Sequence, residues 1–197
     1  HRYLVCRRCC CIMLNTISGL LGGGAPPTDY ESIQTVTVGA GGASSIEFTS
    51  IPSTYTHLQI RGLVKNNSTS LTADVNQLQF NADTATNYNT HYLQGDGAAA
   101  TSAAVANSPS IYAGICARSN ASYTSMFGVS VIDVLDYTNT NKNKTVRTLS
   151  GVDMNGSGYL FYSSGAWRNT NAITSIKLFV SGNNYVQYSS FALYGIK

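Results

Sequence analysis

Charged side chains are scarce in this sequence. Lys and Arg account for 12 of the 197 residues and Asp and Glu for 9, together 11%, which is under half of the roughly 25% usual for a soluble domain. Arg2, Arg7 and Arg8 supply the whole net charge of +3, so the chain from Met13 onward is neutral. A nucleic-acid-binding surface needs clustered Lys and Arg, and we therefore expect no nucleic-acid partner.

Cysteine and long apolar runs are missing from most of the chain. Four of the five cysteines lie within residues 6–11, and Cys116 stands alone. A disulfide framework spreads its cysteines over the fold, so none is predicted, and adjacent thiols cannot converge on one tetrahedral zinc ion. No run of 18 apolar residues occurs, which excludes a transmembrane helix and leaves no membrane partner to expect.

Small neutral hydrogen-bonding side chains take the place of charge. The sequence holds 23 Ser, 20 Thr, 17 Asn and 18 Gly, a composition typical neither of a disordered charged chain nor of a helical bundle. From residue 30 onward, short β-rich runs alternate with turn clusters, as in sandwiches and barrels. We expect strands at 30–38, 44–49, 56–64, 74–81, 87–94, 109–117, 125–135, 144–152, 159–163, 173–181 and 188–196.

Apolar and polar side chains alternate within these runs. In 56–64, for example, Leu58 and Ile60 fall on one face while His57 and Gln59 fall on the other. About ten strands with one polar face each predict an all-β fold of two packed antiparallel sheets, a jelly-roll-like β-sandwich.

The connections carry their own signals. The glycine-rich residues 39–42 predict a hairpin between the first two strands. Residues 66–72 and 136–144 are polar and predict exposed loops. The segment 97–107 has little pattern and predicts a loop or a single helical turn.

Three parts of the chain differ in composition. Residues 1–12 form an atypical leader rich in Cys and Arg, and residues 13–28 combine an apolar anchor with a Gly/Pro hinge. Residues 29–197 hold the predicted sandwich, which is long enough for one substantial core. We expect residues 1–28 to dock on a partner chain.

One turn imitates the start of a calcium loop. Asp153, Asn155 and Ser157 place oxygen ligands at alternate positions, but Ser164 stands where the closing Glu is needed. An Asx-rich turn explains the pattern better, and the calcium site is the weaker interpretation. Asp83 with its Asn neighbours is a weaker candidate of the same type.

The sequence offers no catalytic constellation. No Ser elbow or His-centred triad occurs, and Asp133 with Asp136 is the pair of carboxylates that could approach each other. Turn formation explains Asp136 equally well. We expect no enzyme activity and no cofactor.

Three segments of the chain carry a resemblance: YESIQTVTVGAGGASSIEFTSIPSTYTHLQIRG, LQFNADTATNYNTHYLQGDG and SSGAWRNTNAITSIKLFVSGNNYVQYSSFALYGIK. They resemble a family of small structural proteins of tailed bacteriophages, abundant among marine and cyanobacterial phages. The similarity spans residues 13–197, and its most recognisable part is the ending SFALYGIK. The family residues that can be placed are Phe80, Asn81, Asp83, Asn87, Tyr88, Trp167, Phe191, Tyr194 and Gly195.

The resemblance implies a component of the virion. It implies a non-enzymatic β domain on the particle surface, as capsid decoration, cement or head fibre, and it implies that the placed residues determine the fold or an interface. The expected partners are the major capsid or tail proteins, bound through residues 1–28, and further copies of the chain, with a trimer favoured. A tail fibre or receptor-binding tail protein that holds host surface glycans is the alternative, and a capsule depolymerase is a distant one.

Overall fold

The computed structural model describes residues 29–69, 73–119 and 124–197. The predicted leader, anchor and hinge therefore lie outside the described residues. Within them no helix forms, so no helix capable of spanning a membrane occurs there. The strands are β1 (Tyr30–Thr37), β2 (Ser45–Phe48), β3 (His57–Asn66), β4 (Asp74–Phe80), β5 (Tyr88–Gly95), β6 (Ala100–Ser108), β7 (Ile111–Arg118), β8 (Gly128–Leu135), β9 (Lys144–Asp153), β10 (Gly158–Trp167), β11 (Ile176–Val180) and β12 (Ser190–Ile196).

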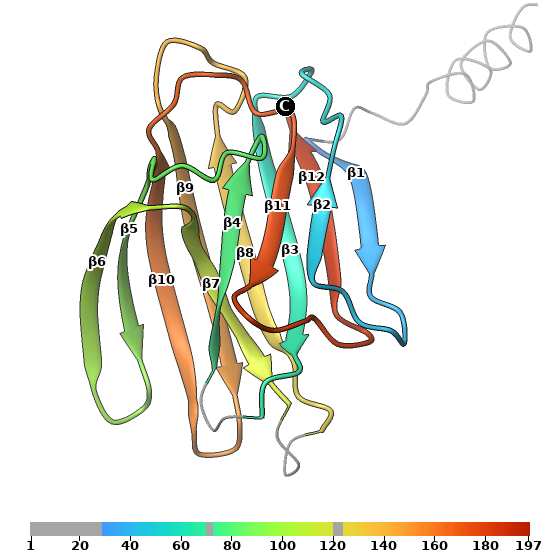
Figure 1. Cartoon of the computed structure of the whole chain (residues 1–197), viewed down its shortest axis with the longest axis vertical. Coiled ribbons are helices and arrows are strands. Elements are labelled where there is room, and N and C mark those ends of the chain that lie inside the picture. Colours follow the sequence, from blue (N-terminus) through green and yellow to red (C-terminus); the bar gives the residue numbers. More distant parts are fainter. Residues whose placement is uncertain (1–28, 70–72, 120–123) are drawn as a thin grey trace, which may run out of the picture.

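Two sheets pack face to face (Figure 1). The large sheet has the order β1-β12-β3-β8-β9-β10-β5-β6, and the small sheet has the order β2-β11-β4-β7. Every pairing within the two sheets is antiparallel. A short parallel ladder between Lys65–Asn66 of β3 and Ala117–Arg118 of β7 joins the sheets.

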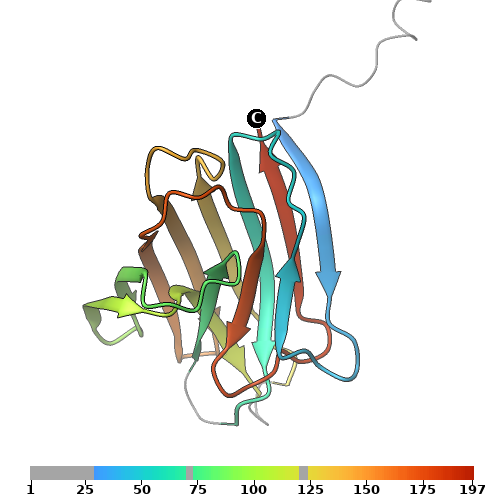
Figure 2. The same ribbon diagram turned by 45° about the horizontal axis from the view of Figure 1, so that its top comes forward.

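The strand order is that of a jelly roll enlarged by two hairpins. When β5, β6, β9 and β10 are set aside, the sheets become β1-β12-β3-β8 and β2-β11-β4-β7, which is the eight-stranded jelly-roll arrangement. The four added strands extend the large sheet sideways beyond β8 (Figure 2). The predicted jelly-roll-like sandwich is thus confirmed, with twelve strands rather than ten or eleven.

The main core lies between the two sheets of the jelly roll. In β3, Leu58 and Ile60 point inward and are fully buried, as the alternation predicts. They meet Phe48, Leu78 and Phe80 of the small sheet in one apolar cluster. Burial of such side chains stabilises the fold by about 1.5–3 kcal/mol each.

The extension has a different interior. Strand β7 contacts the inner faces of β9 and β10 there. One side of β7 bonds to β4, and backbone groups of Tyr112 and Ile115 also bond to hydroxyl side chains of the large sheet. The N–H of Ile115 donates to Ser150 Oγ (3.0 Å), and Ser163 Oγ donates to the Tyr112 carbonyl (3.0 Å). We call these buried hydroxyls, with Thr90, which accepts from the Tyr112 N–H (3.1 Å), the hydroxyl seam.

Three local predictions were wrong. Residues 66–72 and 136–144 are not wholly exposed loops, because Asn66, Tyr137 and Lys144 are fully buried. The segment 97–107 contains most of strand β6, whose small exposed residues give no alternation to read. The first two strands do not form a hairpin, because β1 pairs with β12 and β2 pairs with β11 in the other sheet. Residues 39–42 instead carry the chain from one sheet to the other.

Candidate assembly surface

Large apolar side chains gather on the outward face of the large sheet. Six of them are 48–64% exposed: Leu63, Leu93, Val129, Leu149, Leu160 and Tyr162. The strand register places them in two adjacent rows, one through Leu93, Tyr162, Leu149 and Val131, the other through Leu160, Gly151, Val129 and Leu63. We call these two rows the apolar face. Contiguous exposed apolar surface of this kind usually marks an interaction site.

The apolar face has two hollows that could receive side chains of another surface. Glycines 95 and 151 stand beside Leu160 in its row and leave a hollow of about 620 Å³. A second hollow of about 510 Å³ lies between Leu93, Tyr162 and Ala104 of β6. Side chains of a partner can enter such hollows, which increases the area buried in contact.

A polar row borders the apolar face. Asp133 accepts hydrogen bonds from Arg147 (2.8 Å) and from Gln59 (2.8 Å), and Gln59 accepts one from Arg61 (2.7 Å). The charges on this row are thus hydrogen-bonded along the sheet. Because they already have partners, covering them costs less desolvation free energy than covering isolated charges.

Strand β6 forms an exposed arm at the end of the same sheet. Residues 100–104, 106 and 107 are exposed, so side chains on both faces of the strand meet solvent. The strand bonds to β5 on one side and ends the strand order of the sheet. It contains no charged residue and no proline, which are the usual means of blocking an edge strand.

Four of the residues that carry the resemblance meet where the extension joins the jelly roll. Trp167 Nε1 donates to Asp83 Oδ2 (2.8 Å), and the Tyr88 hydroxyl donates to the Asp83 carbonyl (3.0 Å). The Phe80 N–H donates to that hydroxyl (3.0 Å), and the centre of the Phe80 ring lies 5.6 Å from the centre of the Trp167 ring. These contacts tie β4 of the jelly roll to β5 and β10 of the extension.

The charge and protonation of this joint follow from its contacts. Burial raises the pKa of Asp83, but hydrogen bonds from Asn87, Trp167 and the Ala85 N–H outweigh it, so the pKa lies below its ordinary value. Burial raises the pKa of Tyr88 to about 12. The joint therefore holds a carboxylate and a neutral phenol at neutral pH.

Three more of the residues that carry the resemblance make their contacts elsewhere. Asn81 Oδ1 accepts from the Thr174 N–H (2.8 Å), linking β4 to the segment before β11. Phe191 is buried, and the centre of its ring lies 5.0 Å from that of Tyr185 in an edge-to-face arrangement. Tyr194 lies half-buried on the outward face of β12, where the Arg61 guanidinium covers its ring at 5.0 Å.

The candidate calcium residues form the turn between β9 and β10. Asp153 Oδ1 accepts from the Asn155 N–H (2.8 Å), and the Ser157 carbonyl accepts from the Met154 N–H (2.8 Å). This is the Asx turn that the sequence favoured, and the calcium site stays a prediction. Among the described residues, no three His, Cys, Asp or Glu side chains gather as a metal site would require.

The two carboxylates weighed as a catalytic pair have different neighbours. Asp133 bonds to Arg147, as described, whereas Asp136 pairs with Lys142 and with His57. The hydrogen bond from Lys142 holds the pKa of Asp136 below its ordinary value. A general acid needs the opposite shift, so the contacts of Asp136 are those of an ion-paired carboxylate.

Sequence reasoning did not find the apolar face. Its signal was present, since Leu63, Leu149 and Leu160 occupy positions that the alternation assigns to the polar side of their strands. Comparison with protein-family models, with curated proteins and with solved structures gave no match.

Proposed function

We propose that the protein is a non-enzymatic structural component of a bacteriophage particle, displayed on the surface as capsid decoration, cement or head fibre. The observation that carries this proposal is the apolar face, which a larger assembly would cover. The resemblance to tailed-phage structural proteins supplies the kind of assembly. Other virion proteins, reached through residues 1–28, and further copies of the chain are the proposed partners.

The area and the charge of the face support self-association. Complete burial of six apolar side chains that are already about half buried contributes roughly 1 kcal/mol each, half of the usual value for full burial. The polar row carries both signs of charge, so two copies can meet without placing only like charges together. The uncharged arm β6 can add to the contact of a neighbouring copy. We expect a closed homo-oligomer, with a trimer favoured.

Analytical ultracentrifugation of the full chain tests the surface. Leu149→Glu places a charge at the centre of the apolar face, and we expect it to weaken association by at least about 100-fold. Thr145→Glu is the matched control, because it adds the same charge on the same strand and the same face, outside the two apolar rows. A monomeric wild-type chain, or equal effects of both substitutions, would overturn the proposed surface.

Immunogold labelling of phage particles with an antibody to this chain tests the location. Label over the capsid supports decoration, cement or a head fibre. Label at the tail alone supports the second candidate, a tail fibre or receptor-binding protein. An antibody to the capsid serves as the positive control. If it labels the particles and the antibody to this chain does not, the virion proposal is wrong.

A further inference from the structure

Strand β6 is the outermost strand of the large sheet on the side of the extension (Figure 1). It bonds to β5 along one side, and in the described part of the chain the strand order of the sheet ends with it. Its nine residues are long enough for a further strand to pair with it. The backbone groups along its other side therefore decide what this edge can bind.

The register with β5 shows which backbone groups of β6 point away from the sheet. The Asp96 N–H donates to the Ala99 carbonyl (3.3 Å), so these two residues form a hydrogen-bonded pair at the turn between the strands. Hydrogen-bonded and non-hydrogen-bonded pairs alternate along an antiparallel ladder. Ala100, Ser102 and Ala104 therefore occupy non-hydrogen-bonded pairs with β5. Their N–H and C=O groups point outward from the edge.

Two other edge strands are protected against pairing. Strand β1, at the opposite end of the large sheet, carries Glu31 and has a register shift between Ser32 and Gln34. Strand β2, at one end of the small sheet, has four residues and includes Glu47. Charges, bulges and short length are the usual means of preventing edge-to-edge pairing. From residue 100 to residue 105, β6 has no charge, no proline and no register shift.

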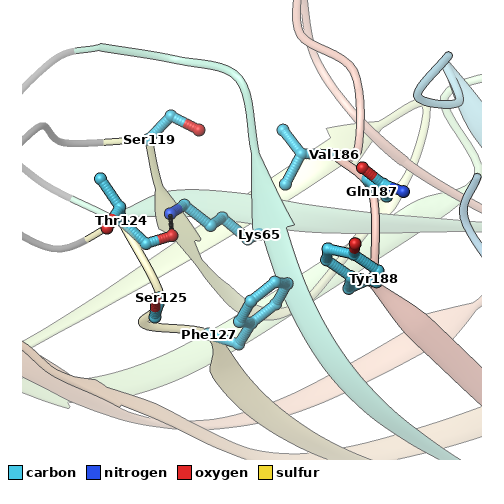
Figure 3. A pocket seen from close by; sticks show the side chains of 8 residues that line it. All are labelled: Lys65, Ser119, Thr124, Ser125, Phe127, Val186, Gln187 and Tyr188. Atoms are coloured by element: carbon cyan, nitrogen blue, oxygen red, sulfur yellow. Dashed lines mark hydrogen bonds between the residues drawn. The ribbon is translucent and has the colours of Figure 1, made fainter. Parts of the chain in front are cut away.

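The last edge, that of β7 in the small sheet, is covered by the large sheet. A parallel ladder joins β7 to β3 at Lys65 and Ala117. At the same end, Lys65 Nζ donates to the Thr124 carbonyl (2.6 Å) in the segment that follows β7 (Figure 3). Farther along β7, the hydroxyl seam bonds to its backbone. Among the described strands, β6 is thus the edge with neither cover nor protection.

We propose that β6 pairs with β6 of a second copy, in antiparallel order, about a two-fold axis at Ser102. In this register Ser102 lies opposite Ser102 of the second copy, and Ala100 lies opposite Ala104. These are the residues whose N–H and C=O groups point outward, so each of the pairs is hydrogen-bonded. The two large sheets become one continuous sheet.

The side chains of β6 favour a second copy of this chain as the partner. A two-fold contact brings each part of the strand close to the same part of its partner, so a charged strand would place like charges together. Strand β6 is uncharged. Its Ala and Ser side chains at the outward-pointing residues are too small to clash across the axis. Thr101 and Ala103, which alternate with them, are exposed as well and leave the other face open.

This contact deepens the proposed function, since it rests on the self-association expected there and gives it a second symmetry. A two-fold contact differs from the trimer favoured for the apolar face, so it joins one closed oligomer to another. It uses no residue of the two apolar rows. The two contacts can therefore fail separately.

Analytical ultracentrifugation of the Leu149→Glu chain tests the β6 contact apart from the apolar face. We expect this chain still to form dimers, with a Kd on the order of 0.1–1 mM. Ser102→Lys or Ser102→Glu, added to it, places like charges opposite each other and should weaken dimerisation about tenfold. An equimolar mixture of the two should dimerise at least as tightly as the Leu149→Glu chain, because Lys then faces Glu across the axis.

Ala106→Lys and Ala106→Glu in the same chain are the matched controls. They add the same charges at an exposed position of the same strand, but the proposed register separates the two copies of this residue by about 26 Å at 3.3 Å per residue. Their mixture should show no gain over either variant alone. A residue-102 mixture that dimerises no more tightly than its components, or an equal gain in the residue-106 mixture, would overturn the inference. A missing gain at residue 102 is also the result expected if β1 of another copy, or another protein, pairs with this edge.

The outcome for the apolar face is read separately. If Leu149→Glu associates as strongly as the wild-type chain, the apolar face is wrong as an assembly surface. The comparison of the residue-102 mixture with its components still decides the β6 contact in that case.

Discussion

The jelly roll and its four-stranded extension share one sheet but are stabilised differently. In the jelly roll, apolar side chains of two sheets meet in a continuous core. In the extension, strand β7 covers the inner face through hydrogen bonds to the hydroxyl seam, and β6 lies beyond that cover. The abundant Ser and Thr residues thus have a role inside the protein, where they satisfy the backbone groups of an edge strand.

A matched pair of core truncations tests this contrast with the largest effect. Phe48→Ala in the jelly roll should lower the free energy of unfolding by about 3–5 kcal/mol, because it opens a cavity between two rigid sheets. Phe161→Ala in the smaller cluster of the extension should cost less, about 3 kcal/mol, because the aromatic rings packed around it are only partly buried. Urea unfolding measures both. Equal losses would show that the extension is packed as tightly as the jelly roll.

The buried Lys144 at the start of β9 gives the next largest effect. Its Nζ donates to the carbonyls of Asn139, Lys142 and Thr170, so Lys144→Met leaves three acceptors without their donor. We expect a loss of about 2–3 kcal/mol in the free energy of unfolding. Lys142→Met removes an exposed ion pair and should cost under about 1 kcal/mol. A stable Lys144→Met variant would contradict this role.

The hydroxyl seam is tested by two adjacent serines on β10. Ser163 donates to the Tyr112 carbonyl inside the extension, whereas Ser164 is exposed on the outward face. Thermal unfolding should show a loss of about 1 kcal/mol for Ser163→Ala and almost none for Ser164→Ala. Indistinguishable melting curves for the two variants would mean that the seam does not stabilise the extension.

Acid sensitivity tests the joint at Asp83 and has the smallest expected effect. The pKa of Asp83 is lower in the folded protein than its ordinary value of 3.8, so the native state binds fewer protons and is stabilised above that pH. Stability should fall as pH drops through the lowered pKa, and Asp83→Asn should show a shallower fall between about pH 5 and pH 2. Melting temperatures of both proteins across this range provide the measurement. If the melting temperatures of both proteins fall equally with decreasing pH, Asp83 does not contribute to the acid sensitivity.

The sequence predicted the parts of the fold that rest on alternation. Leu58 and Ile60 correctly predicted the inward face of β3, and similar alternation predicted the bounds of most strands to within a few residues. Strand β6 was not predicted, because small residues such as Ala, Ser and Thr occupy both of its faces and show no alternation of apolar and polar side chains. The sequence did not predict that Asp83 contacts Trp167, because the two residues lie 84 positions apart in the chain. The apolar face could not be predicted, because only the register between several strands shows that its leucines lie side by side.

Strand β3 runs from one end of the sandwich to the other. At the start of this strand, the Lys197 N–H donates to the Asp29 carbonyl (3.2 Å), so the residues that follow 1–28 enter the sandwich beside its last residue. Lys65 lies at the other end, eight residues beyond His57 and about 26 Å away at 3.3 Å per residue. The described chain therefore enters the sandwich at the end opposite Lys65, and a partner attached at the entry end would leave the far end open to solvent.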